Sequence, residues 1–196
     1  MTGFRLDKGG LIERRQKINF RFNGQQVTGF KGDTIASALM ASGHMLVGRS
    51  FKYHRPRGIM SAGVEEGGAL FNTGDGAARV PNVKGTVTEI SEGLRVYSQN
   101  VFPSPGFDLG AVNGLIAPFI TAGFYYKTFM GPFANTKFWM LCERFIRRAA
   151  GLGQASREAD PSTYDIANGY CDALVIGSGP AGLTAAAGLA EKGLNV

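Results

Sequence analysis

A glycine-rich segment near the C-terminal end, LVIGSGPAG at residues 174–182, constrains this chain most strongly. Its first three residues form a short apolar run, which is typical of a strand buried on both faces in a parallel sheet. The glycines have the spacing G-x-G-x-x-G, and apolar residues then recur at helical spacing from Leu183 to Ala190, with Gly193 placed to end the helix. The sequence therefore predicts a strand, a tight turn and a helix.

The predicted turn has the chemistry that a dinucleotide pyrophosphate requires. Unpaired main-chain N–H groups and the helix dipole favour an anion at a helix N-terminus. Gly177 permits the turn, Gly179 leaves room for the pyrophosphate, and Gly182 lets the helix pack closely on the strand. The predicted cofactor-binding residues are Gly177, Ser178, Gly179, Pro180, Ala181 and Gly182.

The motif is not specific to one ligand. G-x-G-x-x-G occurs in both NAD-binding and FAD-binding proteins, and an ordinary glycine turn is the alternative interpretation. The acidic residue that completes the fingerprint follows about 20 residues onward, whereas the sequence given ends at Val196. We therefore expect residues 171–196 to be an incomplete dinucleotide-binding (Rossmann) domain. The chain would then be a fragment, a truncated reading frame or the first part of a longer polypeptide.

Residues 1–100 are predicted to form a small α+β domain. Apolar and polar residues alternate in a hairpin over 18–30, with Asn23-Gly24 at a turn that needs positive φ at both positions. A helix follows, with Asp33 as its N-cap and Gly43 at its end. Further strands are predicted at 69–72 and 94–98. A hairpin followed by a helix is how a β-grasp domain of the ferredoxin type begins.

Cysteine content bears on the cofactor of that domain. In plant-type ferredoxins, the loop after the helix carries cysteines that hold a [2Fe-2S] cluster. The corresponding loop here, VGRSFKYHRPRGIMSAG, has none, and the two cysteines of the chain are Cys142 and Cys171. We therefore expect no iron–sulfur cluster and no metal site. The sparse cysteines and the lack of a signal-peptide pattern favour a reduced, cytoplasmic protein.

The same loop is rich in cations. It offers Arg49, Lys52, Arg55 and Arg57, with aromatic residues between them, and residues 1–60 hold 11 Lys/Arg against 3 Asp/Glu. One interpretation is a loop that binds an anion or a partner, and the other is a solvated basic loop. No nucleic-acid module is recognised, so nucleic acid is not expected as a partner.

Residues 101–170 are predicted to be an extended aromatic and helical connector. The stretch 102–145 alone holds 11 of the 21 aromatic residues of the chain. The uncharged run 109–126 contains Pro118 and glycines, so we expect no membrane span. Apolar residues at helical spacing over 138–149, with arginines toward the end, indicate a helix that docks against a protein surface. Residues 152–170 are predicted to be a polar linker.

No catalytic residue is predicted. His44 and His54 have no metal-ligand spacing and no evident nucleophile beside them, so we interpret both as structural. The pair Glu65-Glu66 lies in a glycine-flanked turn, where we expect it to pair with nearby basic residues rather than to act as an acid and a base.

The chain resembles the α subunits of heterotetrameric sarcosine oxidases. The resemblance rests on GRSFKYHRPRGIMSAG (48–63), FDLGAVNGLIAPF with AGFYYKTFM (107–130), IRRAAGLG (146–153) and VIGSGPAGL (175–183). It implies a complex of α, β, γ and δ subunits that oxidatively demethylates sarcosine with O₂ and tetrahydrofolate. The products are glycine, H₂O₂ and 5,10-methylenetetrahydrofolate.

The resemblance also implies cofactors and leaves alternatives open. It implies NAD in the α subunit, at Gly177, Gly179 and Gly182 of this sequence, with FAD and FMN elsewhere in the complete complex. Activity of this chain alone is not expected, and its contribution would be a scaffold and part of an NAD site. The alternatives are a non-enzymatic docking module for a flavoprotein subunit and a nonfunctional truncated product.

Overall fold

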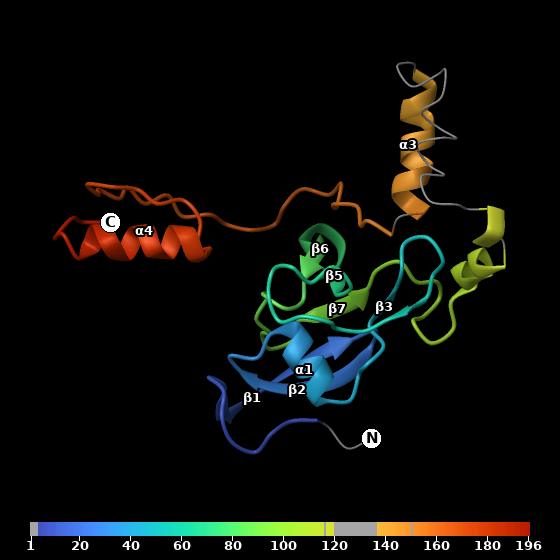
Figure 1. Cartoon of the computed structure of the whole chain (residues 1–196), viewed down its shortest axis with the longest axis horizontal. Helices are drawn as coiled ribbons and strands as arrows, with labels where there is room; N and C mark the ends of the chain where they lie inside the picture. The colour runs from blue at the N-terminus through green and yellow to red at the C-terminus, as the bar shows by residue number, and fades with distance from the viewer. Residues whose placement is uncertain (1–3, 116, 120–136, 150) are drawn as a thin grey trace. The chain divides into compact units, whose positions relative to one another are not determined.

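The computed structural model describes residues 4–115, 117–119, 137–149 and 151–196, and divides the chain into two compact units (Figure 1). The first unit comprises Met1–Pro161 and the second Ser162–Val196. Each is described by itself below.

The first unit is built on a five-stranded mixed sheet with the strand order β2-β1-β7-β5-β6. β1 pairs antiparallel with β2 and parallel with β7, and β5 pairs antiparallel with both β6 and β7. The strands are β1 (Glu13–Phe22), β2 (Gln25–Lys31), β5 (Leu70–Thr73), β6 (Val80–Lys84) and β7 (Arg95–Ser98).

The predicted hairpin and α+β class of this unit are confirmed. Asn23 and Gly24 join β1 to β2 with φ of 48° and 84°, as a tight two-residue turn requires. The Asn23 side chain also bonds Ser98 in both directions, which ties this turn to β7. The two hairpin strands and β7 are therefore connected within one sheet.

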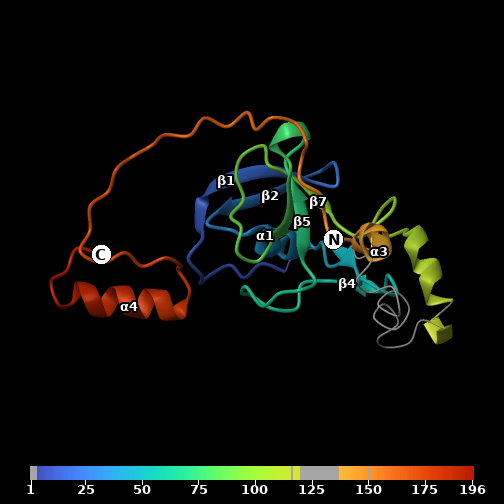
Figure 2. The same ribbon diagram turned by 90° about the horizontal axis from the view of Figure 1, so that it is seen from above.

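Helix α1 (Ile35–Ala41) covers one face of the sheet, as Figures 1 and 2 show. Ile35 and Leu39 lie one helical turn apart and are both fully buried. Phe22 and Phe71 meet edge to face between the strands, with ring centroids 6.0 Å apart. The other members of this core are Phe20, Val27, Ala38, Val47, Ala69, Ile90 and Val96.

The residue predicted to cap α1 has a different role. Thr34 is the N-cap and forms a capping box with Ser37. Asp33 is buried, and its carboxylate accepts hydrogen bonds from the Arg5 guanidinium (2.6 and 3.2 Å), the Phe30 N–H (2.9 Å) and the Ser37 hydroxyl (2.7 Å). Asp33 thus joins the N-terminal segment, the end of β2 and α1, because three donors from separate segments converge on it.

Several short elements were not predicted from the sequence. β3 (Gly48–Arg49) and β4 (Pro56–Arg57) form a separate two-stranded ladder. β6 was also not predicted. Only Pro81 and Val83 of this strand turn toward the interior, and these two residues are too few to show an alternating pattern. The 3₁₀ helices are η1 (Gly76–Ala78), η2 (Leu109–Gly114) and η3 (Ala117–Phe119).

The predicted connector is described in part. A helix forms close to its predicted position, as α3 (Lys137–Ala149), and residues 151–161 contain no helix or strand. Residues 120–136, with much of the uncharged run and of the string AGFYYKTFM, lie outside the described residues, as do the side chains of Trp139 and Phe145. Among the described residues, no helix is both long and apolar enough to cross a membrane.

The second unit contains one helix, α4 (Pro180–Ala190). The strand predicted at 174–176 is not formed: Leu174 and Ile176 are 75% and 90% exposed, and no described segment pairs with them as a strand. Just before them, the N–H of Asp172 donates to the carbonyl of Asn195 (2.8 Å). The segment after α4 thus returns beside the segment that precedes it, as in the crossover of a βαβ unit.

Removing the Asp33 carboxylate should destabilise the first unit. In Asp33→Ala the Arg5 guanidinium, the Phe30 N–H and the Ser37 hydroxyl lose a buried acceptor, and we expect the free energy of unfolding to fall by about 2–4 kcal/mol. Urea unfolding, monitored by circular dichroism, measures this change in the free energy of unfolding. Asp75→Ala, which removes an exposed partner of Arg95, is the matched control and should cost clearly less. Equal losses in the two variants would contradict this role of Asp33.

Candidate functional site

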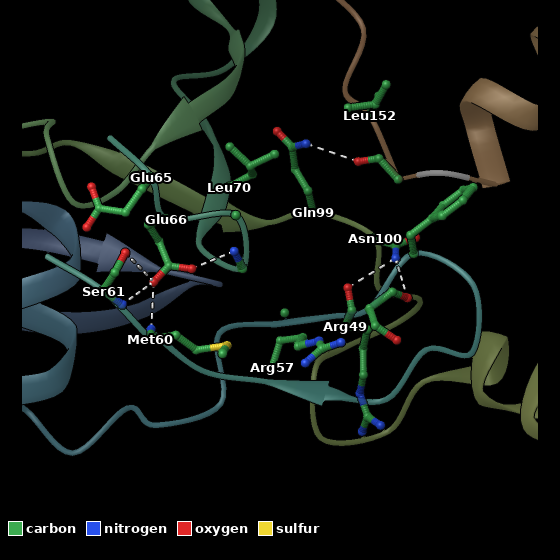
Figure 3. Close-up of a pocket in the computed structure, with 16 residues that line it drawn as sticks. Arg49, Arg57, Met60, Ser61, Glu65, Glu66, Leu70, Gln99, Asn100 and Leu152 are labelled. Carbon is green, nitrogen blue, oxygen red and sulfur yellow. Dashed lines mark hydrogen bonds between the residues drawn. The ribbon is translucent and has the colours of Figure 1, made fainter. Parts of the chain in front are cut away.

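A cavity of about 630 Å³ opens in the first unit, between the loop after α1 and the end of β7 (Figure 3). Its walls come from β3 and β4, from the turn around Glu66, and from Gln99 and Asn100. Leu152 also lines it, because the Gln99 side chain donates to the Gly151 carbonyl (3.0 Å) and holds this segment in place. The basic loop predicted to bind an anion or a partner thus forms one side of a hollow.

Glu66 shapes the wall opposite that loop. It is 3% exposed, and its carboxylate accepts hydrogen bonds from the main-chain N–H groups of Met60 (2.6 Å), Ser61 (2.7 Å) and Gly68 (2.5 Å) (Figure 3). Burial raises the pKa of Glu66, but these donors outweigh it and leave the pKa below its ordinary value. Glu66 is therefore a fixed anion inside the loop. Its carboxylate accepts hydrogen bonds from main-chain N–H groups, whereas the sequence predicted pairing with basic side chains.

The Arg49 side chain is used in hydrogen bonds within the first unit. Its guanidinium donates to the carbonyls of Pro105 (2.8 Å from Nε, 2.5 Å from Nη2) and His54 (3.1 Å). Asn100 holds the adjoining backbone, because its amide donates to the carbonyls of Arg49 and Ser50 (Figure 3). Of the four predicted cations, Arg49 thus serves to join the basic loop to residues 100–105.

The other three cations lie elsewhere on the loop. Lys52 Nζ and the Arg55 guanidinium each lie 4.9 Å from the centroid of the Tyr53 ring, a cation–π arrangement. Arg57 lines the cavity from β4. The structure therefore groups Lys52 with Arg55 at the Tyr53 ring and places Arg49 and Arg57 along the cavity, so the four residues do not converge on one anion.

A histidine and a buried aspartate lock the basic loop to η2. His54 Nδ1 lies 2.6 Å from the Asp108 carboxylate, which also accepts from the Phe102 and Gly110 N–H groups (2.9 and 3.3 Å). The His54 ring rests so closely on Gly110 that a β-carbon there would overlap it. This agrees with a structural His54. No local pattern indicated Asp108, because its partner lies 54 residues earlier.

The glycine turn of the second unit leads into the N-terminus of α4, and its backbone leaves no room for side chains at two positions. Gly177 has φ of 114°, a conformation that L residues with side chains rarely adopt. Gly179 is the N-cap of α4, and Pro180 begins the helix. Gly182 lies against the Gly177 carbonyl, where a β-carbon would overlap main chain. The six predicted cofactor-binding residues thus form a glycine-dependent turn into a helix N-terminus.

The side chains of the described residues show no metal centre. No group of three or more His, Cys, Asp or Glu residues among them is arranged to hold an ion. Cys142 and Cys171 are both free and half-buried.

Two protein families match parts of the chain. Residues 15–101 match the family described as a 2Fe-2S iron-sulfur cluster binding domain, and residues 172–196 match an FAD binding domain. With the mixed sheet and the single helix of residues 13–98, the first match supports an α+β, ferredoxin-like N-terminal domain.

Curated relatives match along the whole chain. "Sarcosine oxidase subunit alpha" of Rhizobium meliloti (strain 1021) is 53% identical over 197 residues, all of this chain and 20% of that protein. The resemblance to sarcosine oxidase α subunits is confirmed. The α subunits of Corynebacterium sp. strains U-96 and P-1 are 31% and 30% identical, over 15% and 16% of their own lengths. The chain spans no more than about a fifth of these sarcosine oxidase α subunits.

A solved structure is also similar, at a level too low to support any argument. The L-proline dehydrogenase from P. horikoshii aligns with 44% of this chain and 16% of its own, at 18% identity and a TM-score of 0.36.

The expectation that the chain has no iron–sulfur cluster is wrong, because residues 15–101 match a family described as binding one. The cysteine content of a loop shows which ligands that loop supplies, and it does not show which cofactor the family binds. The matched residues contain no cysteine, so this segment itself lacks the thiolates that would hold such a cluster. The second match also names FAD where NAD was expected.

Replacing Glu66 by glutamine should destabilise the first unit in a pH-dependent way. Because the folded-state pKa is lowered, the carboxylate contributes stability above its ordinary pKa of 4.5, and this contribution is lost as the pH falls through the folded-state pKa. We expect Glu66→Gln to cost about 1–3 kcal/mol at pH 7, since an NH₂ group would face N–H donors.

Urea unfolding of both proteins between pH 7 and pH 3 measures the effect. The difference between the two proteins should stay constant down to about pH 5 and then shrink. A difference that is the same at pH 3 and pH 7 would show that the carboxylate charge plays no part. Glu65→Gln, at the exposed neighbouring position, is the control.

Proposed function

We propose that this chain forms part of an oxidoreductase subunit of the sarcosine oxidase α type, and that residues 172–196 contribute the pyrophosphate-binding turn of a dinucleotide site. The observation that carries the proposal is the turn from Gly177 to Gly182, in which two positions exclude a side chain. Homology to the sarcosine oxidase α subunits and the match to an FAD binding domain support it.

The residues of the turn bind and orient the cofactor in this proposal. The N–H groups of Ala181 and Gly182 lie in the first turn of α4, where no intrahelical acceptor is available, and the helix dipole adds positive potential. Pro180 offers no donor but fixes φ at the start of the helix. A bound flavin would supply the two-electron oxidation of the substrate amine. No residue of the chain is assigned to that step.

The proposal extends to the complete enzyme to which such a subunit would belong. That enzyme would oxidatively demethylate sarcosine with O₂ and tetrahydrofolate, giving glycine, H₂O₂ and 5,10-methylenetetrahydrofolate, with β, γ and δ subunits as partners. The first unit would serve as scaffold, which is supported by the internal use of Arg49, Asn100 and Glu66.

Adding one methyl group at Gly182 tests the proposed site. We expect Gly182→Ala in the full-length polypeptide to weaken FAD binding by about tenfold or more, because the methyl group must displace the Gly177 carbonyl and with it the turn. Gly188→Ala is the matched control, since it adds a methyl group to the same helix in open space. Isothermal titration calorimetry with FAD measures both. Equal affinities for the two variants would remove the basis of the proposal.

A further inference from the structure

We propose that the exposed face of η2 and the adjoining turn is the surface by which this chain docks onto another subunit of the oxidase, one with an apolar contact face rimmed by acidic residues. We name this surface the η2 ridge. It consists of Phe102, Phe107, Leu109, Val112 and Leu115. The choice of partner rests on the proposed function, whereas the location of the surface rests on the geometry of these residues.

Three apolar residues form one stripe of the ridge. Leu109, Val112 and Leu115 follow one another at intervals of three, and a 3₁₀ helix has three residues per turn, so their side chains lie above one another. They are 53%, 60% and 81% exposed. A helix normally turns such a stripe toward the core. Here the stripe faces outward.

The two phenylalanines extend the stripe. The Leu109 N–H donates to the Phe102 carbonyl (2.7 Å), and the Ser104 N–H donates to the Phe107 carbonyl (3.2 Å), so residues 102–109 form a closed turn next to η2. Both phenylalanine side chains are about two-thirds exposed. Together, the five side chains present on the order of 500 Å² of apolar surface, against about 800 Å² that each partner buries in a standard interface.

The ridge is held rigidly from behind. His54 and Asp108 are hydrogen bonded beneath it, Gly110 is packed on the His54 ring, and Asn113 donates to the Lys52 carbonyl (3.4 Å). These contacts fix the outward orientation of the stripe, because the opposite side of η2 packs against the basic loop. A rigid apolar surface loses little conformational entropy when a partner covers it.

Charge selects the class of partner. Residues 101–115 carry one charged residue, Asp108, and it is buried. The loop alongside carries Lys52 and Arg55, which lie against the Tyr53 ring, and residues 48–64 contain no Asp or Glu. A second copy of this chain would bring two such basic loops together across a twofold axis, where like charges repel. An acidic rim on a different subunit complements them.

The test measures association of the full-length polypeptide with the other oxidase subunits, purified together without it. We expect Val112→Ser combined with Leu115→Ser to raise the dissociation constant by about tenfold or more. Val87→Ser, at an exposed apolar position between β6 and β7 and outside the ridge, is the matched control and should change the dissociation constant by less than about twofold. Arg55→Glu should slow association, and the slowing should diminish as salt is added.

Several results would overturn the inference. Unchanged affinity in the Val112 and Leu115 variant would show that the ridge is not the contact, while leaving the proposed function in place. No association of the wild-type polypeptide would contradict both. A homodimer that the same two substitutions dissociate would identify a second copy as the occupant. Binding of the wild type, but not of the variant, to vesicles that contain phosphatidylserine would identify a membrane surface instead.

Discussion

The irregular half of the first unit depends on buried side chains that satisfy main-chain groups. Strands β1, β2, β5, β6 and β7 pair their own N–H and carbonyl groups, but the long loops between them cannot. Glu66 accepts three N–H groups of its loop, and Asn100 donates to two carbonyls of the basic loop. An unpaired polar group would cost about 1–3 kcal/mol where it is buried. These few residues therefore decide the path of the loops that line the cavity.

The same constraint explains why the basic loop is a poor anion site as a whole. Fixing a loop of this length requires donors as well as acceptors, and Arg49 supplies three of them to carbonyls of Pro105 and His54. A guanidinium used in this way has little left to offer a ligand. Lys52 and Arg55 lie on the Tyr53 ring, so they present charge at the surface rather than in the cavity. The loop is suited to meeting a charged surface and not to enclosing a small anion.

Local patterns predicted the elements whose causes are local. Asn23-Gly24 forms its predicted turn because the turn depends on adjacent residues alone. The predicted N-cap at Asp33 was wrong by one residue, since Thr34 caps α1 and forms a capping box with Ser37. The pairing of Asp33 with Arg5 and that of Asp108 with His54 could not be predicted in this way, since these partners lie 28 and 54 residues away. The glycine turn was recognised because its requirements are steric and lie within six residues. The strand before it was not formed, because a strand needs a neighbour and a sequence run does not supply one.

The two family matches concern redox cofactors at the two ends of the chain. Residues 15–101 match a family described as binding a 2Fe-2S cluster and residues 172–196 match an FAD binding domain, although residues 15–101 supply no thiolate. Within residues 15–101, the Glu66 carboxylate is a buried anion beside the basic loop. It accepts hydrogen bonds from three main-chain N–H groups, which are therefore not available to a ligand. What the first unit presents outward is instead a rigid apolar ridge beside a basic loop. The interior polar groups of this unit are hydrogen bonded within its loops, so a partner would bind to the outer surface that these loops position.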